Sequence, residues 1–88
     1  MTHVVKVPSP LRSYTAGAAQ VSARGDTLGA VLAELERAYP GMRFRMIDEQ
    51  DRIRPHIRIF INTREAPALG APLAAGDVVH LVCALSGG

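Results

Sequence analysis

The helical periodicity of apolar residues is strongest in the first half of the chain. Apolar side chains recur there at the i, i+3, i+4, i+7 spacing of an amphipathic helix, at Leu28, Val31, Leu32, Leu35 and Tyr39. Gly25-Asp26-Thr27 offers capping oxygens before this stripe, and Pro40-Gly41 ends it because a residue that precedes proline avoids the helical region. The pattern predicts a helix from about Thr27 to Ala38.

Two segments near the N-terminus favour strands instead. His3 to Val7 is rich in β-branched residues and stops at Pro8, which cannot donate to a sheet ladder. After a loop that contains proline and glycine, residues 19–23 alternate weakly between apolar and polar. Together these segments predict an opening hairpin with a long loop.

The second half of the chain holds the clearest strand patterns. Ile57 to Ile61 alternates with a period of two, and residues 62–65 supply turn chemistry after it. Residues 78–85 form a continuous apolar run, which is typical of a strand interior to a sheet. The segment 42–54 mixes isolated apolar residues with charges and predicts a helical turn followed by a mobile loop.

The order of these elements predicts an α+β fold with one helix packed across a mixed sheet of four to five strands, a β-grasp. We expect residues 1–85 to form this domain and residues 86–88 to form a flexible tail. If the isoleucines of the third strand face the helix, the opposite face of the sheet is open and is a plausible docking face for a partner. The residues expected on it are Arg58, Phe60, His80 and Val82, beside Val4 and Lys6.

Composition narrows the class of protein. A chain of 88 residues has room for one small core, and a single cysteine, Cys83, excludes an internal disulfide. No apolar run reaches the length of a membrane span and the N-terminus lacks a signal peptide, so we expect a cytoplasmic protein in a reducing compartment. The net charge of +2 is small, and acidic residues interrupt the arginines, which argues against a nucleic-acid partner.

The sequence holds no catalytic apparatus that we recognise. Its three histidines lack the spacing and cysteine companions of a zinc site. No serine, histidine and acid arrangement stands out, and no glycine-rich loop is followed by lysine to bind phosphate. We therefore expect a protein that is not an enzyme, binds no metal and holds no cofactor of its own.

The end of the chain carries a resemblance to a known family. Residues 79–88, Val-His-Leu-Val-Cys-Ala-Leu-Ser-Gly-Gly, resemble the end of ubiquitin and the Gly-Gly ends of sulfur carriers of the MoaD/ThiS family. The resemblance is greatest to actinobacterial cysteine-synthesis sulfur carriers and extends over nearly the whole chain. The segments that carry it are Pro10-Leu11-Arg12, Thr15-Ala16-Gly17, Gly25-Asp26-Thr27-Leu28-Gly29-Ala30-Val31, Ile59-Phe60-Ile61-Asn62 and Gly76-Asp77.

This resemblance implies a role for the C-terminal carboxylate. In the family, an E1-like adenylating and sulfurtransferase enzyme uses ATP to activate the terminal carboxylate, which then becomes a thiocarboxylate. Gly88 would be the sulfur-carrying terminus, on a tail of Leu85, Ser86, Gly87 and Gly88 that enters partner active sites. Glycine suits such a tail on physical grounds, because it has no Cβ and fits a narrow channel.

The resemblance also implies the acceptors of the sulfur. A pyridoxal-phosphate-dependent cysteine synthase would receive it, and a JAMM-type metalloprotease would later release cysteine. Molybdopterin synthesis with its large synthase subunit, thiamine synthesis, tRNA thiolation and thio-sugar synthesis remain open. Two other classes also remain open, namely a ubiquitin-like protein modifier and an interaction domain with an inert tail.

Cys83 allows two interpretations. A thiolate near the tail could pass on sulfur as a persulfide. Its position on the same side of the strand as Val79 and Leu81 favours a buried, inert thiol instead. Related carriers often have proline at this place, so the resemblance is weaker here.

Overall fold

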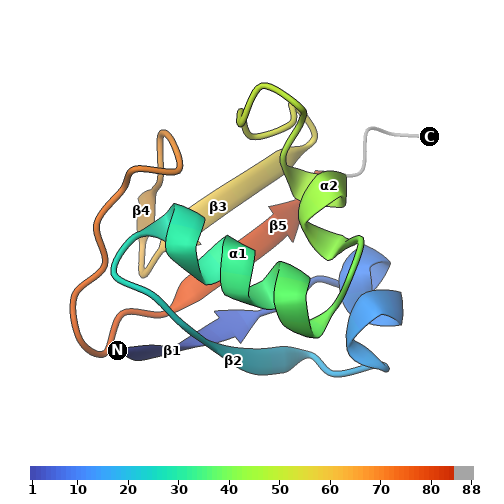
Figure 1. Cartoon of the computed structure of the whole chain (residues 1–88), viewed down its shortest axis with the longest axis horizontal. Coiled ribbons are helices and arrows are strands. Elements are labelled where there is room, and N and C mark those ends of the chain that lie inside the picture. The colour runs from blue at the N-terminus through green and yellow to red at the C-terminus, as the bar shows by residue number, and fades with distance from the viewer. Residues whose placement is uncertain (85–88) are drawn as a thin grey trace.

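The structure is a computed structural model that describes residues 1–84. A single mixed sheet of five strands, in the order β2-β1-β5-β3-β4, carries the long helix α1 across one face (Figure 1). This arrangement confirms the predicted α+β class and the helix laid across a sheet. The elements are β1 (Thr2–Lys6), the 3-10 helix η1 (Ser9–Thr15), β2 (Gln20–Arg24), α1 (Leu28–Ala38), α2 (Met42–Met46), β3 (Ile57–Ile61), β4 (Arg64–Glu65) and β5 (Val79–Cys83).

Helix α1 forms where the apolar stripe predicted it. The Thr27 side chain caps its first turn by accepting a hydrogen bond from the backbone N–H of Ala30 at 3.2 Å. At the other end, the Glu36 carboxylate accepts hydrogen bonds from the backbone N–H groups of Gly41 and Arg43. These two bonds, that from Gly41 above all, lower the pKa of Glu36 and tie the end of α1 to the start of α2.

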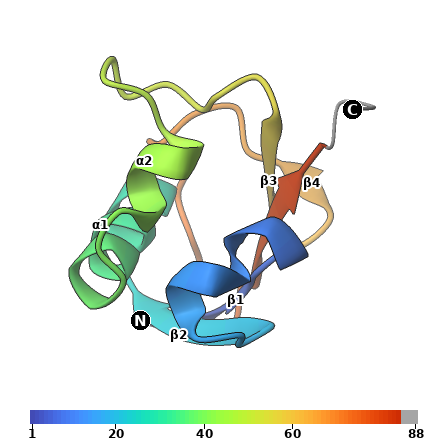
Figure 2. The ribbon, with the colours of Figure 1, turned by 90° about the vertical axis from the view of Figure 1, so that its right-hand side faces the viewer.

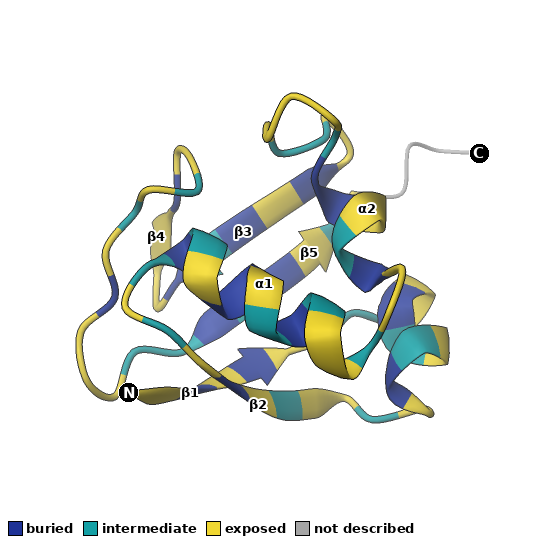
Figure 3. Ribbon diagram, in the orientation of Figure 1, coloured by how far each residue is buried: buried dark blue, intermediate teal, exposed yellow. Residues whose placement is uncertain are grey.

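The core lies between α1 and the inner face of the sheet (Figure 3). Burial alternates along β3 as the period of two requires, so its three isoleucines face α1. Segment 42–54 contributes more to this core than its mixed sequence indicates. The buried side chains that α1, α2 and the residue after α2 supply are Leu28, Val31, Leu32, Leu35, Met42, Met46 and Ile47.

Two elements differ from the sequence prediction. The loop expected after the first strand is the 3-10 helix η1, which has a proline in its first turn and buries Leu11. The two residues after it, Ala16 and Gly17, both have positive φ, of 54° and 87°. The residues expected to form a turn after β3 include β4, a strand of two residues that closes a hairpin at Asn62. Both elements are too short for periodicity to reveal them.

Strand β5 lies in the middle of the sheet, as its continuous apolar run predicts. It pairs in parallel with β1, with Val79 opposite Val5, and antiparallel with β3, with Cys83 opposite Ile57. The backbone N–H of Ala84 then donates to the carbonyl of His56 at 2.8 Å. The chain is therefore held to the sheet up to its last described residue, and the predicted boundary at residue 85 falls outside the described residues.

Candidate functional site

The predicted working group and its tail, Leu85, Ser86, Gly87 and Gly88, lie outside the described residues. The structure instead defines the base from which the tail starts. At this end β5 pairs with β3 alone, with Val82 opposite Arg58 and Cys83 opposite Ile57, because its pairing with β1 stops at His80. The bond from Ala84 to His56 continues the contact with β3 by one residue. The position at which the tail begins is thus determined by the rigid sheet.

The predicted docking face does come together on the side of the sheet away from α1. Arg58 lies opposite Val82 in the pairing of β3 with β5, and Phe60 lies opposite His80. On the other side of β5, Lys6 is the partner of His80. Val82 is 38% exposed, which is unusual for a valine in a central strand and matches an uncovered face.

Phe60 is less accessible than the sequence suggested. It is half-buried, and the guanidinium of Arg58 lies over its ring at 5.6 Å from the centroid. Two hydrogen bonds to Glu65, at 2.7 and 3.0 Å, hold that guanidinium in place. This ion pair raises the pKa of Arg58 and lowers that of Glu65. A partner that contacts Phe60 must therefore also contact or displace Arg58.

Cys83 is half-buried and packs against the apolar core, in agreement with the inert interpretation. Burial raises the pKa of its thiol, and the positive charge of Arg45 opposes this shift only in part. Because the thiolate is the nucleophilic form, a raised pKa leaves Cys83 poorly reactive near neutral pH. The structure thus favours a packing role over persulfide chemistry.

His3 has a structural role that its sequence position did not reveal. It is 1% exposed, and its two ring nitrogens lie 3.0 Å from the carbonyl oxygens of Asp77 and Gly25.

Within residues 1–84 there is no group of three or more side chains suited to a metal ion. In the same range no helix has the length and apolar character needed to cross a membrane.

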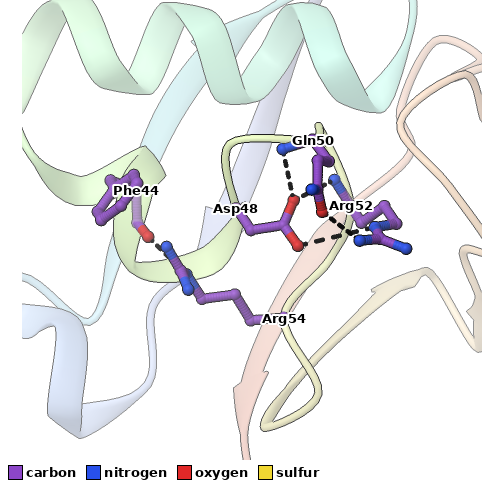
Figure 4. A network of polar contacts seen from close by, with 5 residues as sticks. All are labelled: Phe44, Asp48, Gln50, Arg52 and Arg54. Atoms are coloured by element: carbon purple, nitrogen blue, oxygen red, sulfur yellow. Dashed lines mark hydrogen bonds and ion pairs between the residues drawn. The ribbon is translucent and has the colours of Figure 1, made fainter.

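The sequence analysis missed an exposed aromatic residue on α2. Phe44 is 56% exposed, and the guanidinium of Arg54 lies 4.5 Å from its ring centroid (Figure 4). The signal was present, because a helical turn that buries Met42 and Met46 must direct the side chain midway between them outward.

Comparison with known proteins defines the class. The ThiS family matches residues 5–88, so the chain belongs to the ThiS family. It is 38% identical to the sulfur carrier protein CysO of Mycobacterium tuberculosis, and to that of Mycobacterium bovis, over an alignment that covers 100% of each chain. The resemblance inferred from the tail and the other motifs is therefore confirmed over the full length.

Solved structures show the same similarity in three dimensions. The crystal structure of Mycobacterium tuberculosis CysO superposes with a TM-score of 0.87 at 34% identity, over 93% of this chain and 98% of that one. A chain of the Amycolatopsis orientalis BexX/CysO complex superposes with a TM-score of 0.89 at 26% identity, over 97% of this chain and 98% of that one. SAMP1 from Haloferax volcanii superposes with a TM-score of 0.83 at 31% identity, over 100% of both chains. These neighbours confirm the ubiquitin-like β-grasp.

Proposed function

We propose that this chain is a sulfur carrier for cysteine biosynthesis and that the carboxylate of Gly88 holds the sulfur. The observation that carries this function is the full-length likeness to the sulfur carrier protein CysO, which extends to Gly88 itself. The family and the fold point to a small carrier rather than a catalyst. Reactions at Gly88 are therefore assigned to partner enzymes.

The described residues would serve as the rigid base of a delivery arm. Ala84 is fixed to the sheet through His56, and four residues, 85–88, follow it. Fully extended, four residues span at most about 14 Å. The Gly88 carboxylate would thus act within that radius of Ala84, which is enough to enter a partner's active site while the domain stays outside.

The proposed chemistry has two steps. In the first, a Gly88 carboxylate oxygen attacks the α-phosphorus of ATP on an E1-like adenylating enzyme, and pyrophosphate leaves. In the second, hydrosulfide attacks the acyl carbon of the resulting acyl-adenylate and AMP leaves, so that this carbon exchanges a C–O bond for a C–S bond and loss of the proton gives the thiocarboxylate. ATP belongs to the activating enzyme, and the thiocarboxylate is a modification of this chain.

We also propose that Arg58, Phe60, His80 and Val82 form the docking face for the activating enzyme. Replacing Phe60 by alanine removes the largest apolar side chain of that face, so we expect the KM for the carrier in adenylation to rise several-fold. The matched control is Arg37→Ala on the exposed side of α1, which should leave KM unchanged. Equal KM values for Phe60→Ala and wild type would remove this face from the proposal.

Mass spectrometry of the intact protein from its native host tests the carrier function directly. A fraction of molecules heavier by the difference between one sulfur and one oxygen atom, located at Gly88, is the expected result. Covalent adducts with other proteins would indicate a modifier instead. A mass that shows neither change would favour an interaction domain with an inert tail.

The acceptor is tested with the thiocarboxylate form. Incubated with a pyridoxal-phosphate-dependent cysteine synthase and O-phosphoserine or O-acetylserine, it should yield a cysteine adduct on Gly88, which a JAMM-type metalloprotease would then hydrolyse. A complex of BexX with CysO is known in Amycolatopsis orientalis, which supports a protein partner for this chain as well. Failure to form the adduct would favour the large subunit of molybdopterin synthase as acceptor.

A protein modifier is the second candidate, and the similarity to SAMP1 favours it. A second crystal structure of this protein, the small archaeal modifier protein 1 of Haloferax volcanii, shares the fold at 30% identity with a TM-score of 0.76. Lys6 is the only lysine of this chain, so conjugated chains would have a single side-chain branch point. Isopeptide-linked adducts that disappear when Gly87 and Gly88 are deleted would support this role.

A further inference from the structure

A second polar surface lies on and after α2, and the proposed docking face does not include it. We call it the arginine–aromatic cluster, and it consists of Phe44, Arg45, Arg54 and His56. These four residues line one open pocket of about 340 Å³. Phe44 and Arg45 come from α2, whereas Arg54 and His56 come from the segment that leads into β3.

The cluster is held in place but is not neutralised. The Nε of Arg54 donates to the carbonyl oxygen of Phe44 at 2.7 Å, which keeps the guanidinium over the Phe44 ring (Figure 4). Among the described residues, neither Arg45 nor Arg54 forms an ion pair with a carboxylate. The cluster therefore presents two positive charges and an exposed ring on a fixed backbone.

Neighbouring arginines differ in this respect. Arg43, Arg52 and Arg58 each pair with an acidic residue of the chain. The pKa of Asp48 is lowered, and the largest cause is a hydrogen bond from the backbone N–H of Arg52. The positive charge of Arg54 makes a smaller contribution to the same shift. The Asp48 carboxylate is thus engaged within its own loop, and it does not reach the cluster with a hydrogen bond.

The cluster borders the base of the tail. Arg45 and His56 also line a smaller pocket together with Cys83 and Ala84. Figure 2 looks onto this end of the molecule, where α2, η1 and the end of β5 are all visible. The carbonyl of His56 accepts the hydrogen bond from Ala84, so the tail base is bonded directly to a residue of the cluster.

The length of the tail constrains what the cluster must face. Gly88, the proposed sulfur-carrying residue, is the fourth residue after Ala84 and lies at most about 14 Å from it. Any enzyme that acts on Gly88 must bring the mouth of its active-site channel within that distance of Ala84. The residues beside Ala84 then lie against the rim of this channel.

The charge of the cluster indicates the chemistry of that rim. Guanidinium groups bind carboxylates in a bidentate manner, and arginine and aromatic residues are enriched at protein interfaces. Two arginines without an acidic partner in the described chain are complementary to acidic side chains on another protein. We propose that the arginine–aromatic cluster is a second docking surface, which binds an acidic rim around the tail-binding channel of the activating enzyme.

This inference rests on the proposed carrier function, and the kinetics of adenylation test both. The assay is ATP–pyrophosphate exchange by the adenylating enzyme from the same organism, with the KM for the carrier and kcat measured separately. The test variant is the double substitution Arg45→Glu with Arg54→Glu. Its matched control is Arg24→Glu, an exposed arginine at the end of the edge strand β2.

We expect the double variant to raise KM at least about tenfold with kcat within about twofold of wild type, because docking and not chemistry is affected. The KM of the wild type should also rise with salt concentration, and that of the variant should not, since screening removes the same attraction. Arg54→Lys, which keeps the charge and loses the planar fork, should give an intermediate KM.

Each outcome separates the two proposals. Wild-type KM in the double variant, or an equal change in Arg24→Glu, would overturn the docking surface and leave the carrier function intact. Absence of any exchange with the wild type would overturn the carrier function and this inference together. Urea unfolding shows whether each variant is folded. If the double variant is unfolded, the salt dependence of the wild-type KM and the KM of Arg54→Lys decide whether the cluster is a docking surface.

Discussion

The two ends of strand β5 differ in whether the polar side chains around them are hydrogen-bonded within the protein. At its start, a buried histidine, an aspartate and an asparagine satisfy one another and the backbone. His3 contacts the carbonyl of Asp77, and the Asp77 carboxylate accepts hydrogen bonds from the Asn62 side chain and from the backbone N–H of Ala74. The Asn62 side chain in turn accepts a hydrogen bond from the backbone N–H of Val78. We call these three side chains the latch.

At the far end of β5 the polar groups are left available. Arg45 and Arg54 pair with no carboxylate in residues 1–84, and His56 and Phe44 are exposed. This difference indicates that the start of β5 contributes to stability and that its far end faces partner proteins. A network that is satisfied internally fixes the register of the central strand, whereas charges without internal partners are complementary to another molecule.

Removal of His3 should break the latch with the largest effect. The variant His3→Ala leaves a cavity and removes the ring N–H that donates to a backbone carbonyl, of Asp77 or Gly25, so we expect a loss of about 3 kcal/mol in the free energy of unfolding. Urea unfolding monitored by circular dichroism measures it. His80→Ala is the control, because His80 is half-buried on the open face and should cost much less. Similar losses in both variants would contradict a special role for the latch.

Asp77 should make the latch sensitive to acid. Its hydrogen bond from the backbone of Ala74, followed by that from Asn62, lowers the pKa of its carboxyl below the ordinary value. A lowered folded-state pKa means that the stabilisation is complete above the unfolded-state pKa, near about 4, and is lost as the pH falls through the folded-state value.

The variant Asp77→Asn tests this linkage. It should be less stable than wild type at pH 7, by less than His3→Ala, and the difference between the two proteins should shrink as the pH falls below about 4. Urea unfolding over a series of pH values measures the difference. A gap that stays constant through this range would show that the carboxylate charge does not contribute to the latch.

The fold was predictable to the extent that its elements are long and periodic. The α1 stripe and the alternation of β3 fixed both the class and the inner face of the sheet. Segment 42–54 was less predictable, because Met42, Met46 and Ile47 are buried by contacts with α1 and other distant parts of the chain that no local period encodes. The elements η1 and β4 were missed for another reason, because they are too short to show a period.

The candidate site was predictable only in part. Strand alternation placed Arg58, Phe60, His80 and Val82 on one face, and the pairing of β3 with β5 brings them together there. Local sequence does not show that Arg58 covers Phe60, since the cover depends on Glu65 in another strand. It also does not show that Arg45 and Arg54 form no ion pair with a carboxylate of residues 1–84, because pairing of charges is decided by tertiary distances.

Cys83, at the partner-facing end of β5, should react slowly with alkylating reagents. Burial raises the pKa of its thiol, so the thiolate fraction near neutral pH is smaller than for an ordinary cysteine. We expect alkylation by iodoacetamide to be several-fold slower than for a free cysteine at pH 7.5, with a rate that continues to climb at higher pH. A rate equal to that of glutathione would show that this end opens frequently.

Of the substitutions considered, Phe44→Ala should change stability least. Its contrast with His3→Ala is the sharpest test of the difference between the two ends of β5. The Phe44 ring is 56% exposed, so Phe44→Ala removes little buried surface, and the free energy of unfolding should change by no more than about 0.5 kcal/mol. The same substitution leaves the Phe44 carbonyl that Arg54 binds in place, so the loop is expected to keep its path. Urea unfolding beside His3→Ala is the measurement. A loss comparable to that of His3→Ala would mean that the arginine–aromatic cluster also holds the fold together, and that the two ends of β5 do not divide stability from recognition.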